Sequence, residues 1–407
     1  MQNWETVRLG DISEIVTNKI NVSKLEKNNY ISTENMLPNR GGIYEATNLP
    51  NILLTPSFQV NDILVSNIRP YFKKIWYAKF SGGCSNDVLI FRAKQNTDPK
   101  FLYYVLSDNG FFRYAMSTSK GTKMPRGDKI AIMKYQVPKF DMVVQKKIAA
   151  VLSALDDKIE LNNKINQNLE QQAQAIFKSW FIDFEPFGGK MPDDWKIKKL
   201  SECTNQIIRG FTSKYVEKSN LINLNQKVNK GNILEKQYYK YLDERFEVPK
   251  EKFARKKDIL LNSLGQGTLG RIHFWNENAK NIVIDQHIAI VRAKKEVTTA
   301  EYLYLLLSSS KYKEYFENCI TGTTGMLMLN ISVVRDTEIT LPTFSIQTQF
   351  SNIASSFYEM IEQNNQETAR LAQLRDALLP KLMSGEIDVS KVNIDDSEYK
   401  ILGGKND

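Results

Sequence analysis

The chain has 407 residues, which corresponds to roughly two to four domains at about 100–200 residues per domain. Its 55 Lys and Arg exceed its 46 Asp and Glu, so the net charge is +9, and 42% of the residues are hydrophobic. This composition excludes a wholly disordered chain. The sequence has neither a run of about 18 apolar residues nor the basic and apolar stretches of a signal peptide near its start, so we expect a cytoplasmic protein.

Cysteine and histidine are scarce. The three cysteines, Cys84, Cys203 and Cys319, are odd in number and far apart, which argues against a disulfide framework and a cysteine-ligated zinc. Two histidines, His273 and His287, leave little for acid–base chemistry. We therefore expect a protein that binds rather than catalyses, with no catalytic residue and no metal ligand to assign. Carboxylate chemistry with Mg²⁺ remains open.

In chain order, the second half of the sequence repeats features of the first half. The order of the matches is preserved, and the offset between them drifts only from 191 to 204 residues. An ordered series of this kind indicates duplication of a whole module, the alternative being two unrelated domains of similar composition. The matches include Trp4 with Trp195, Leu9 with Leu200, 62–65 with 258–261, 91–94 with 291–294, Gly121 with Gly322, 137–138 with 341–342, and 159–163 with 361–365.

Each module begins with a mixed globular part. Short apolar runs at 62–66 and 87–92, bounded by Gly, Asn and Pro, are typical of strands, and runs at 258–262 and 287–292 repeat the pattern. Helical spacing of Leu and Tyr follows at 99–115 and at 299–316. The predicted fold class is α+β, with two pseudo-repeated globular domains.

Each module ends in one long predicted helix. Residues 144–184 contain no Pro or Gly, and apolar residues recur in alternating steps of four and three, the pattern of a coiled-coil seam. We expect the two helices to pair as an antiparallel coiled coil, with polar seam residues that set the register; packing of each helix on its own domain is the alternative. The seam comprises Ile148, Leu152, Leu155, Ile159, Asn162, Asn166, Leu169, Ala173, Ile176 and Trp180 in the first helix, and Ile346, Phe350, Ile353, Phe357, Met360, Asn364, Glu367, Leu371, Leu374 and Leu378 in the second.

These patterns divide the chain into five segments. A Pro- and Gly-containing break at 186–192 separates the modules, and the polar tail contains Gly403 and Gly404. The expected segments are a globular domain at 1–142, a helical spacer at 143–185, a second globular domain at 186–344, a second spacer at 345–386, and a disordered tail at 387–407.

Basic loops with interleaved aromatic residues are the candidates for nucleic-acid binding. Lys and Arg neutralise phosphates, while Arg and Asn can bind base edges in pairs of hydrogen bonds. The loops recur at the same points in both modules and differ most between them, which suits two recognition domains with different targets; solvated loops and core aromatics are the alternative. The candidates are Asn67, Arg69, Tyr71, Lys73, Lys74, Lys120, Thr122, Lys123, Arg126 and Lys129 in the first module, and Arg209, Lys214, Gln266, Thr268, Arg271 and Thr323 in the second.

One glycine motif imitates a cofactor loop. Gly265, Gly267 and Gly270 match G-x-G-x-x-G, but a dinucleotide or S-adenosylmethionine loop should open a helix, and residues 271–275 have strand character. We expect a hairpin turn here. No Walker A motif and no Asn-Pro-Pro-aromatic motif of amino-methyltransferases is present.

Taken together, these features resemble the specificity subunits of type I restriction–modification systems. The resemblance covers the chain to about residue 386 and rests on the doubled plan, on Trp4 with 9–12, on 67–76 with 82–88, and on 145–149 and 378–382. It departs mildly from the family pattern at Ser201-Glu202, and the apolar stretch 326–329 puts base contact by that loop in doubt.

The resemblance implies a role without catalysis. Each globular domain would recognise one half of a bipartite, asymmetric double-stranded DNA target, and the seam helices would act as a spacer and dock two methyltransferase subunits, with two restriction subunits as further partners. No cofactor is expected on this chain; S-adenosylmethionine, ATP and Mg²⁺ would belong to the partner subunits, and no membrane is involved. The alternatives are a self-contained DNA methyltransferase or nuclease, and a scaffold that does not bind DNA.

Overall fold

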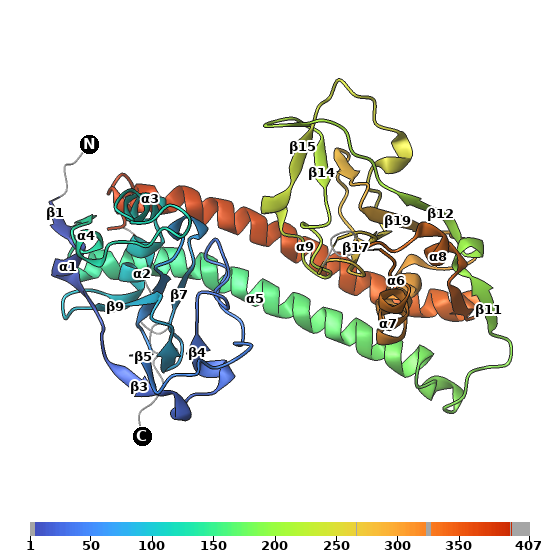
Figure 1. The fold of residues 1–407 in the computed structure, drawn as a ribbon, viewed down its shortest axis with the longest axis horizontal. Helices are drawn as coiled ribbons and strands as arrows, with labels where there is room; N and C mark the ends of the chain where they lie inside the picture. Colours follow the sequence, from blue (N-terminus) through green and yellow to red (C-terminus); the bar gives the residue numbers. More distant parts are fainter. Residues whose placement is uncertain (1–4, 266, 323–326, 391, 393–407) are drawn as a thin grey trace. The chain divides into compact units, whose positions relative to one another are not determined.

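The computed structural model describes residues 5–265, 267–322, 327–390 and 392 (Figure 1). Trp4, Gln266, Thr323 and most of the tail expected to be disordered lie outside the described residues. The chain divides into two compact units, one of residues 1–160 with 368–407 and one of residues 161–367. Each of the two long helices therefore contributes one part to each unit.

The first unit contains two four-stranded sheets. One has the order β2-β9-β6-β7 with antiparallel neighbours, and the other has the order β3-β5-β8-β4, in which β4 and β8 are parallel. A short antiparallel pair joins β1 to β10. The strands are β1 Thr6–Arg8, β2 Ser13–Ile15, β3 Lys19–Asn21, β4 Tyr30–Ile31, β5 Leu54–Phe58, β6 Ile63–Ser66, β7 Ile75–Tyr77, β8 Gly82–Cys84, β9 Val88–Ala93 and β10 Gln136–Pro138; the short helices are α1 Leu9–Ile12, α2 Pro99–Ser107, α3 Asn109–Ser117 and α4 Lys129–Ile132.

The second unit repeats this plan. Its first sheet has the order β12-β19-β16-β17, again antiparallel, and its second has the order β13-β15-β14-β18, with β14 and β18 parallel. Strands β11 and β20 pair as β1 and β10 do. The strands are β11 Lys196–Lys199, β12 Thr204–Arg209, β13 Tyr215–Val216, β14 Ile222–Leu224, β15 Lys240–Leu242, β16 Asp258–Asn262, β17 Ile272–Trp275, β18 Ile282–Ile284, β19 Ile288–Ala293 and β20 Glu338–Leu341; the short helices are α6 Ala300–Ser308, α7 Ser310–Asn318 and α8 Ile331–Asp336.

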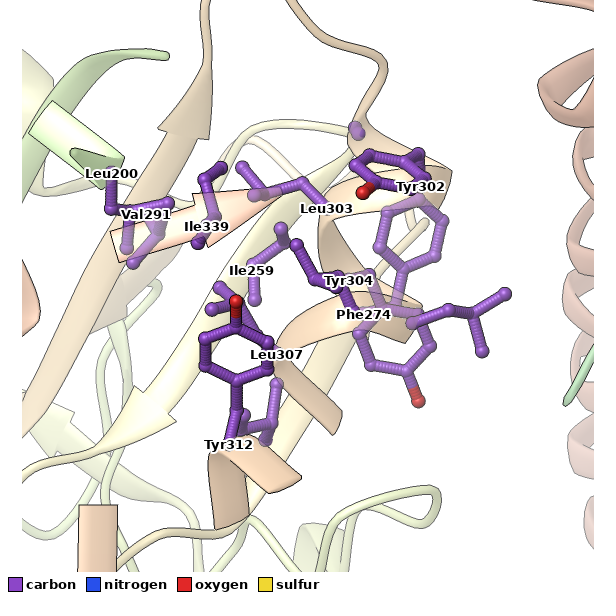
Figure 2. Close-up of a cluster of buried hydrophobic side chains, with 14 of the residues drawn as sticks. Leu200, Ile259, Phe274, Val291, Tyr302, Leu303, Tyr304, Leu307, Tyr312 and Ile339 are labelled. Atoms are coloured by element: carbon purple, nitrogen blue, oxygen red, sulfur yellow. The ribbon is translucent and has the colours of Figure 1, made fainter. Parts of the chain in front are cut away.

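The central strands are buried on both faces because they lie between two layers. Ile259 and Leu261 of β16 pack in the cluster that contains α6, while Leu260 packs in a separate cluster with the second sheet. Ile63 and Leu64 of β6 divide between two clusters in the same way. Successive side chains of a strand point to opposite faces, so a short run of apolar residues fills both layers. Figure 2 shows the helix-facing cluster of the second unit, where side chains of α6 and α7 cover the sheet. The predicted α+β class and its duplication are confirmed.

Two long helices, α5 (Met142–Phe181) and α9 (Phe344–Met383), run antiparallel to each other. In the first unit Arg375 Nη1 lies 2.6 Å from Asp156 Oδ1. In the second unit Asn162 Nδ2 donates to Glu367 Oε2 at 2.7 Å, and Asn166 Nδ2 donates to Asn365 Oδ1 at 2.9 Å. Residue numbers fall along one helix as they rise along the other, so the predicted antiparallel pairing is confirmed.

The predicted seam of α9 is wrong at three positions. Ile353, Met360 and Leu374 are 38%, 47% and 47% exposed, so they do not lie in a buried seam. Phe350 of the predicted seam is buried in the core of the second unit, together with Ala354 and Tyr358, which were not predicted there. Their spacing of four residues differs from the predicted heptad because the globular part, and not the partner helix alone, covers this face. The two interpretations of the long helix, pairing and packing on its own domain, therefore both apply.

Candidate nucleic-acid interface

The two basic stretches of the first module, about 50 residues apart in sequence, lie together on one surface. Residues 67–74 form the loop between β6 and β7, and residues 119–129 precede and begin α4; we call these segments the first loop pair. Arg69 N donates to Pro125 O at 2.8 Å, and Gly127 N donates to Asn67 O at 3.2 Å. Ile68 and Lys120 each form an isolated β-bridge with Arg126. Backbone hydrogen bonds thus hold the predicted basic residues in one place.

Cations of the first loop pair are presented to solvent. Lys120 is 83% exposed and pairs with Asp128 at 2.8 Å, and Arg126 is 59% exposed and pairs with Asp87 at 3.0 Å. The hydrogen bond from Lys120 lowers the pKa of the Asp128 carboxyl. Such exposed pairs contribute little to stability and can exchange a carboxylate for a phosphate. The other predicted residues of this loop that are exposed are Thr122, Lys123 and Lys129.

Not every predicted cation is free to bind a ligand. Lys74 is partly buried, its ammonium donates to Thr33 O at 2.6 Å, and burial lowers its pKa. Lys74 therefore fixes the loop rather than presenting a charge. Tyr71 and Phe72 beside it are exposed, with ring centroids 4.6 Å apart, which gives an aromatic surface next to the cations.

The backbone of this loop is strained. Arg69 and Lys73 have φ values of 49° and 50°, in the left-handed region that residues with a Cβ rarely adopt. They flank the 3₁₀ turn Pro70–Phe72. Strained residues of this kind persist where the surrounding contacts hold them, and they cluster at functional sites.

The second module builds the same arrangement from different residues. Residues 263–271 and 320–330 form the second loop pair, of which 266 and 323–326 are not described. Gly265 N donates to Leu327 O at 3.2 Å, Leu329 N donates to Ser263 O at 2.9 Å, and isolated bridges join Met328 to both Leu264 and Thr321. These bonds match those of the first loop pair one for one, so Met328 takes the place of Arg126 and Thr321 that of Lys120.

The partner of Arg126 also changes. Asn67 N donates to Asp87 O in the first module, and Ser263 N donates to His287 O in the second. His287 therefore takes the place of Asp87, and its Nδ1 lies 2.7 Å from Asp285 Oδ1. The two loop pairs share one backbone frame but expose different chemistry.

The glycine motif closes a hairpin, as predicted. It connects β16 and β17, which are antiparallel, and Gly265, Gly267 and Gly270 all have positive φ. Arg271 Nη2 donates to Gly267 O at 2.7 Å, and Thr268 Oγ1 donates to Gly265 O at 3.3 Å. Both predicted side chains thus bond within the hairpin. The two other predicted residues of this surface, Gln266 and Thr323, lie outside the described residues.

Arg209 is the last residue of β12, and Lys214 directly precedes β13. Arg209 is partly buried and its carbonyl accepts from Lys252 Nζ at 2.9 Å, whereas Lys214 is exposed. Lys240, which is not among the predicted residues, has its ammonium 4.6 Å from the centre of the Tyr215 ring. The contact crosses between β13 and β15, which pair around Tyr215 and Leu242, so no local spacing indicates it.

The described residues contain no group of three or more His, Cys, Asp or Glu side chains placed to hold a metal ion. None of their helices combines the length and the apolar character needed to cross a membrane.

Comparison with known proteins gives a consistent result. The family model described as "Type I restriction modification DNA specificity domain" matches residues 1–171 and 192–373. The chain is 25% identical to the type I restriction enzyme HindI specificity subunit of Haemophilus influenzae, over 95% of this chain and all of the relative. It is 27% identical to the MjaIX specificity subunit of Methanocaldococcus jannaschii, over 74% of this chain and 71% of the relative. The fold matches the crystal structure of a type I restriction–modification S subunit from M. genitalium with a TM-score of 0.56 and 16% identity, over 94% of this chain and 96% of that one.

Proposed function

The chain belongs to the family of type I restriction–modification DNA specificity subunits, and from this premise we propose that its two loop pairs read the two halves of a bipartite DNA target. It is the DNA specificity subunit of a type I restriction–modification system, and such a subunit is itself not catalytic. A self-contained methyltransferase or nuclease is therefore no longer a candidate.

The proposal rests on one observation: the two loop pairs have the same backbone hydrogen bonds but different side chains at matching positions. Both loop pairs are held by the same backbone bonds, yet Arg126 and Lys120 are replaced by Met328 and Thr321 in the second. Lys and Arg fix a protein on the phosphates, while side chains at base edges select the sequence. Two similar frames with different side chains fit two different half-sites, and hence an asymmetric target.

We assign residues 1–142 and 186–344 to target recognition and residues 143–185 and 345–386 to the helical spacer, with 387–407 as the tail. The paired helices would set the number of unread base pairs between the half-sites. They would also dock two modification subunits, which methylate adenine, and two restriction subunits. Ile353 and Leu374, which are exposed on α9, suit docking better than the seam.

Cofactor chemistry belongs to the modification and restriction subunits in systems of this family. We place S-adenosylmethionine on the former and ATP with Mg²⁺ on the latter, and none of these on this chain. Since such a complex acts on DNA inside the cell, we also place the chain in the cytoplasm.

A loop exchange tests the division of labour. The chain is expressed with its own modification subunit, and methylated adenines are profiled across the DNA of the host cell, before and after residues 120–129 are replaced by the corresponding loop of another specificity subunit. We expect one half-site to change while the other half-site and the spacing stay the same. The unchanged half-site is the internal control. A change in both half-sites, or in neither, contradicts the proposal.

A further inference from the structure

A buried arginine links the first loop pair to helix α9. The side chain of Arg40 is only 7% exposed, and its Nη1 lies 2.7 Å from Asp376 Oδ1. Asp376 also binds Arg375 at 2.9 Å, and Arg375 reaches Asp156 on α5 at 2.6 Å. Burial favours the neutral form of Asp376 and on its own would raise the pKa of the carboxyl. The positive charges of Arg40 and Arg375 together have the larger effect, so the pKa lies below its ordinary value. The globular part of the first unit is thus connected to the parts of α5 and α9 that belong to that unit.

The segment that carries Arg40 also supports the loop that carries Lys73. Asn39 N donates to Phe72 O at 2.8 Å, and Arg40 N donates to Lys73 O at 3.0 Å. Asn39 and Arg40 have φ values of 54° and 62°, so the strain described for Arg69 and Lys73 extends to the supporting segment. These four are among the seven non-glycine residues with positive φ in the described part of the chain. Such conformations last only where contacts over-determine them.

The second module has a link at the corresponding place, made by other residues. Asn232 Nδ2 donates to Glu170 Oε2 on α5. Gly231 N, beside Asn232, donates to Oδ1 of the buried Asn229 at 2.8 Å, and Asn229 Nδ2 donates to Asn262 Oδ1 at 3.0 Å. Asn262 Nδ2 in turn donates to Thr268 O at 3.0 Å, within the glycine hairpin of the second loop pair. In both modules, therefore, a short series of hydrogen bonds runs from a long helix through a supporting segment to a recognition loop.

We propose that Arg40 and Asn232 are positioning residues for target recognition, which hold each loop pair in a fixed place on the helix beside it without touching DNA. This inference rests on the function proposed above. A rigid loop can place its side chains against base edges reproducibly, whereas a loop that drifts still binds phosphates but discriminates bases poorly. Loss of either link should therefore relax one half-site and leave the overall fold in place.

The chemistry of the first link makes Arg40→Met an informative variant. Methionine keeps the apolar part of the buried side chain. Asp376 retains Arg375 as its partner and is partly exposed, so the substitution leaves no lone buried charge. The backbone bonds from Asn39 and Arg40 to the loop remain possible, since they do not involve the side chain.

The experiment uses the full chain in complex with its modification subunits. The probe is a pool of duplex DNA with randomised sequence, and selection followed by sequencing gives the base preference at every position of both half-sites. For Arg40→Met we expect discrimination at the first half-site to fall about tenfold, since a bidentate base contact contributes on this scale. The second half-site should be unchanged. Arg40→Lys should recover part of the loss, and Asn232→Ala should relax the second half-site alone.

Lys79→Met is the matched control. It also removes an ion pair between the globular part and a long helix of the first unit, with Glu160 of α5, but no bond to the loop pair is involved. We expect it to leave both half-sites unchanged. Thermal melting of each complex separates loss of discrimination from loss of fold.

The possible outcomes separate this inference from the proposed function. If Arg40→Met and Asp376→Asn both keep full discrimination while the exchange of 120–129 changes the first half-site, the positioning role is overturned and the proposed function stands. If the loop exchange changes neither half-site, the proposed function fails. Should Arg40→Met fail to fold, Asp376→Asn decides, because Asp376 is accessible to solvent; a folded variant with unaltered discrimination overturns the inference.

Discussion

Arg126 and Met328 occupy the same place in two copies of one backbone frame. Arg126 forms bridges with Ile68 and Lys120, and Met328 forms them with Leu264 and Thr321. The frame is held by main-chain bonds, so side chains at these positions can change without loss of the loop structure. That separation between a constant frame and variable side chains is what a protein needs if its target sequence is to change while its fold does not.

The exposed cations of the first loop pair should contact phosphates. We expect Lys123→Gln and Arg126→Gln each to weaken binding to target DNA and to reduce the slope of log affinity against log salt concentration by about 1, since each phosphate contact releases condensed counterions. Binding titrations of the complex at several salt concentrations measure the slope. Lys139→Gln is the control, because Lys139 is also exposed and paired, with Glu5, but lies outside the loops. A slope that stays the same in both loop variants would show that these cations do not contact phosphates.

Much of the candidate site could be predicted because its parts are local in sequence. The basic loop 119–129 stands out by composition alone, and its recurrence in the second module points to a function. The link between Arg40 and Asp376 could not be predicted, because 336 residues separate the two and neither lies in a distinctive pattern. Lys74 shows the converse error: a lysine in a basic cluster suggests a phosphate contact, whereas the fold directs it to a backbone carbonyl.

At the level of secondary structure, the central strands β6, β9, β16 and β19 were predictable because their apolar runs are short and bounded by turn residues; the short strands of the second sheets carry no such pattern. The long helices were predictable for the opposite reason, their uninterrupted length. Their buried faces were not, since a heptad pattern assumes that a partner helix alone covers the helix. Ala354 and Tyr358, which lie outside the predicted seam, are buried against the globular part, whereas Ile353 is exposed.

One buried glutamine near the start of each long helix joins it to the globular part. Gln347 Oε1 accepts from Thr298 Oγ1 at 2.8 Å, and its Nε2 donates to Pro342 O at 2.8 Å. Gln145 Oε1 accepts from Asp98 N at 2.9 Å, and its Nε2 donates to Phe140 O at 2.9 Å. In each module the glutamine therefore fixes the start of the long helix to the globular part by equivalent hydrogen bonds.

Replacement of either glutamine should destabilise its module. Gln145→Ala and Gln347→Ala each leave buried polar groups without a partner, at about 1–3 kcal/mol for each group, so we expect a loss of roughly 2–4 kcal/mol in the free energy of unfolding. Denaturant unfolding monitored by circular dichroism measures the loss. Gln171→Ala and Gln363→Ala, at exposed positions of the same helices, should change it by less than about 0.5 kcal/mol. Equal effects at buried and exposed positions would refute the structural role.

Over the whole chain, the duplication extends from the order of the strands to single contacts. Arg92 binds Asp62 in the first module as Arg292 binds Asp258 in the second, and in both the carboxylate is buried. The contacts that the two modules share lie in the cores and at the N-terminal ends of the long helices. The residues that differ in chemistry between the modules lie in the loop pairs. Selection on the target would act on the loops and selection on the fold would act on the rest, so one chain can carry two recognition domains of different specificity.

If the paired helices measure the spacing between half-sites, shortening both should shorten the spacer. Deletion of residues 158–164 from α5 and 366–372 from α9 removes one heptad from each, about 10 Å of helix, and keeps the helix faces within about 20° of their original direction. It also removes Asn162 together with Glu367, so this bond is lost without leaving one partner behind. We expect the methylated motif to keep both half-sites and to lose up to about three unread base pairs, at 3.4 Å for each. Deletion from α5 alone mismatches the helices and should abolish methylation. Retention of the original spacing in the double deletion would mean that the helices do not set it.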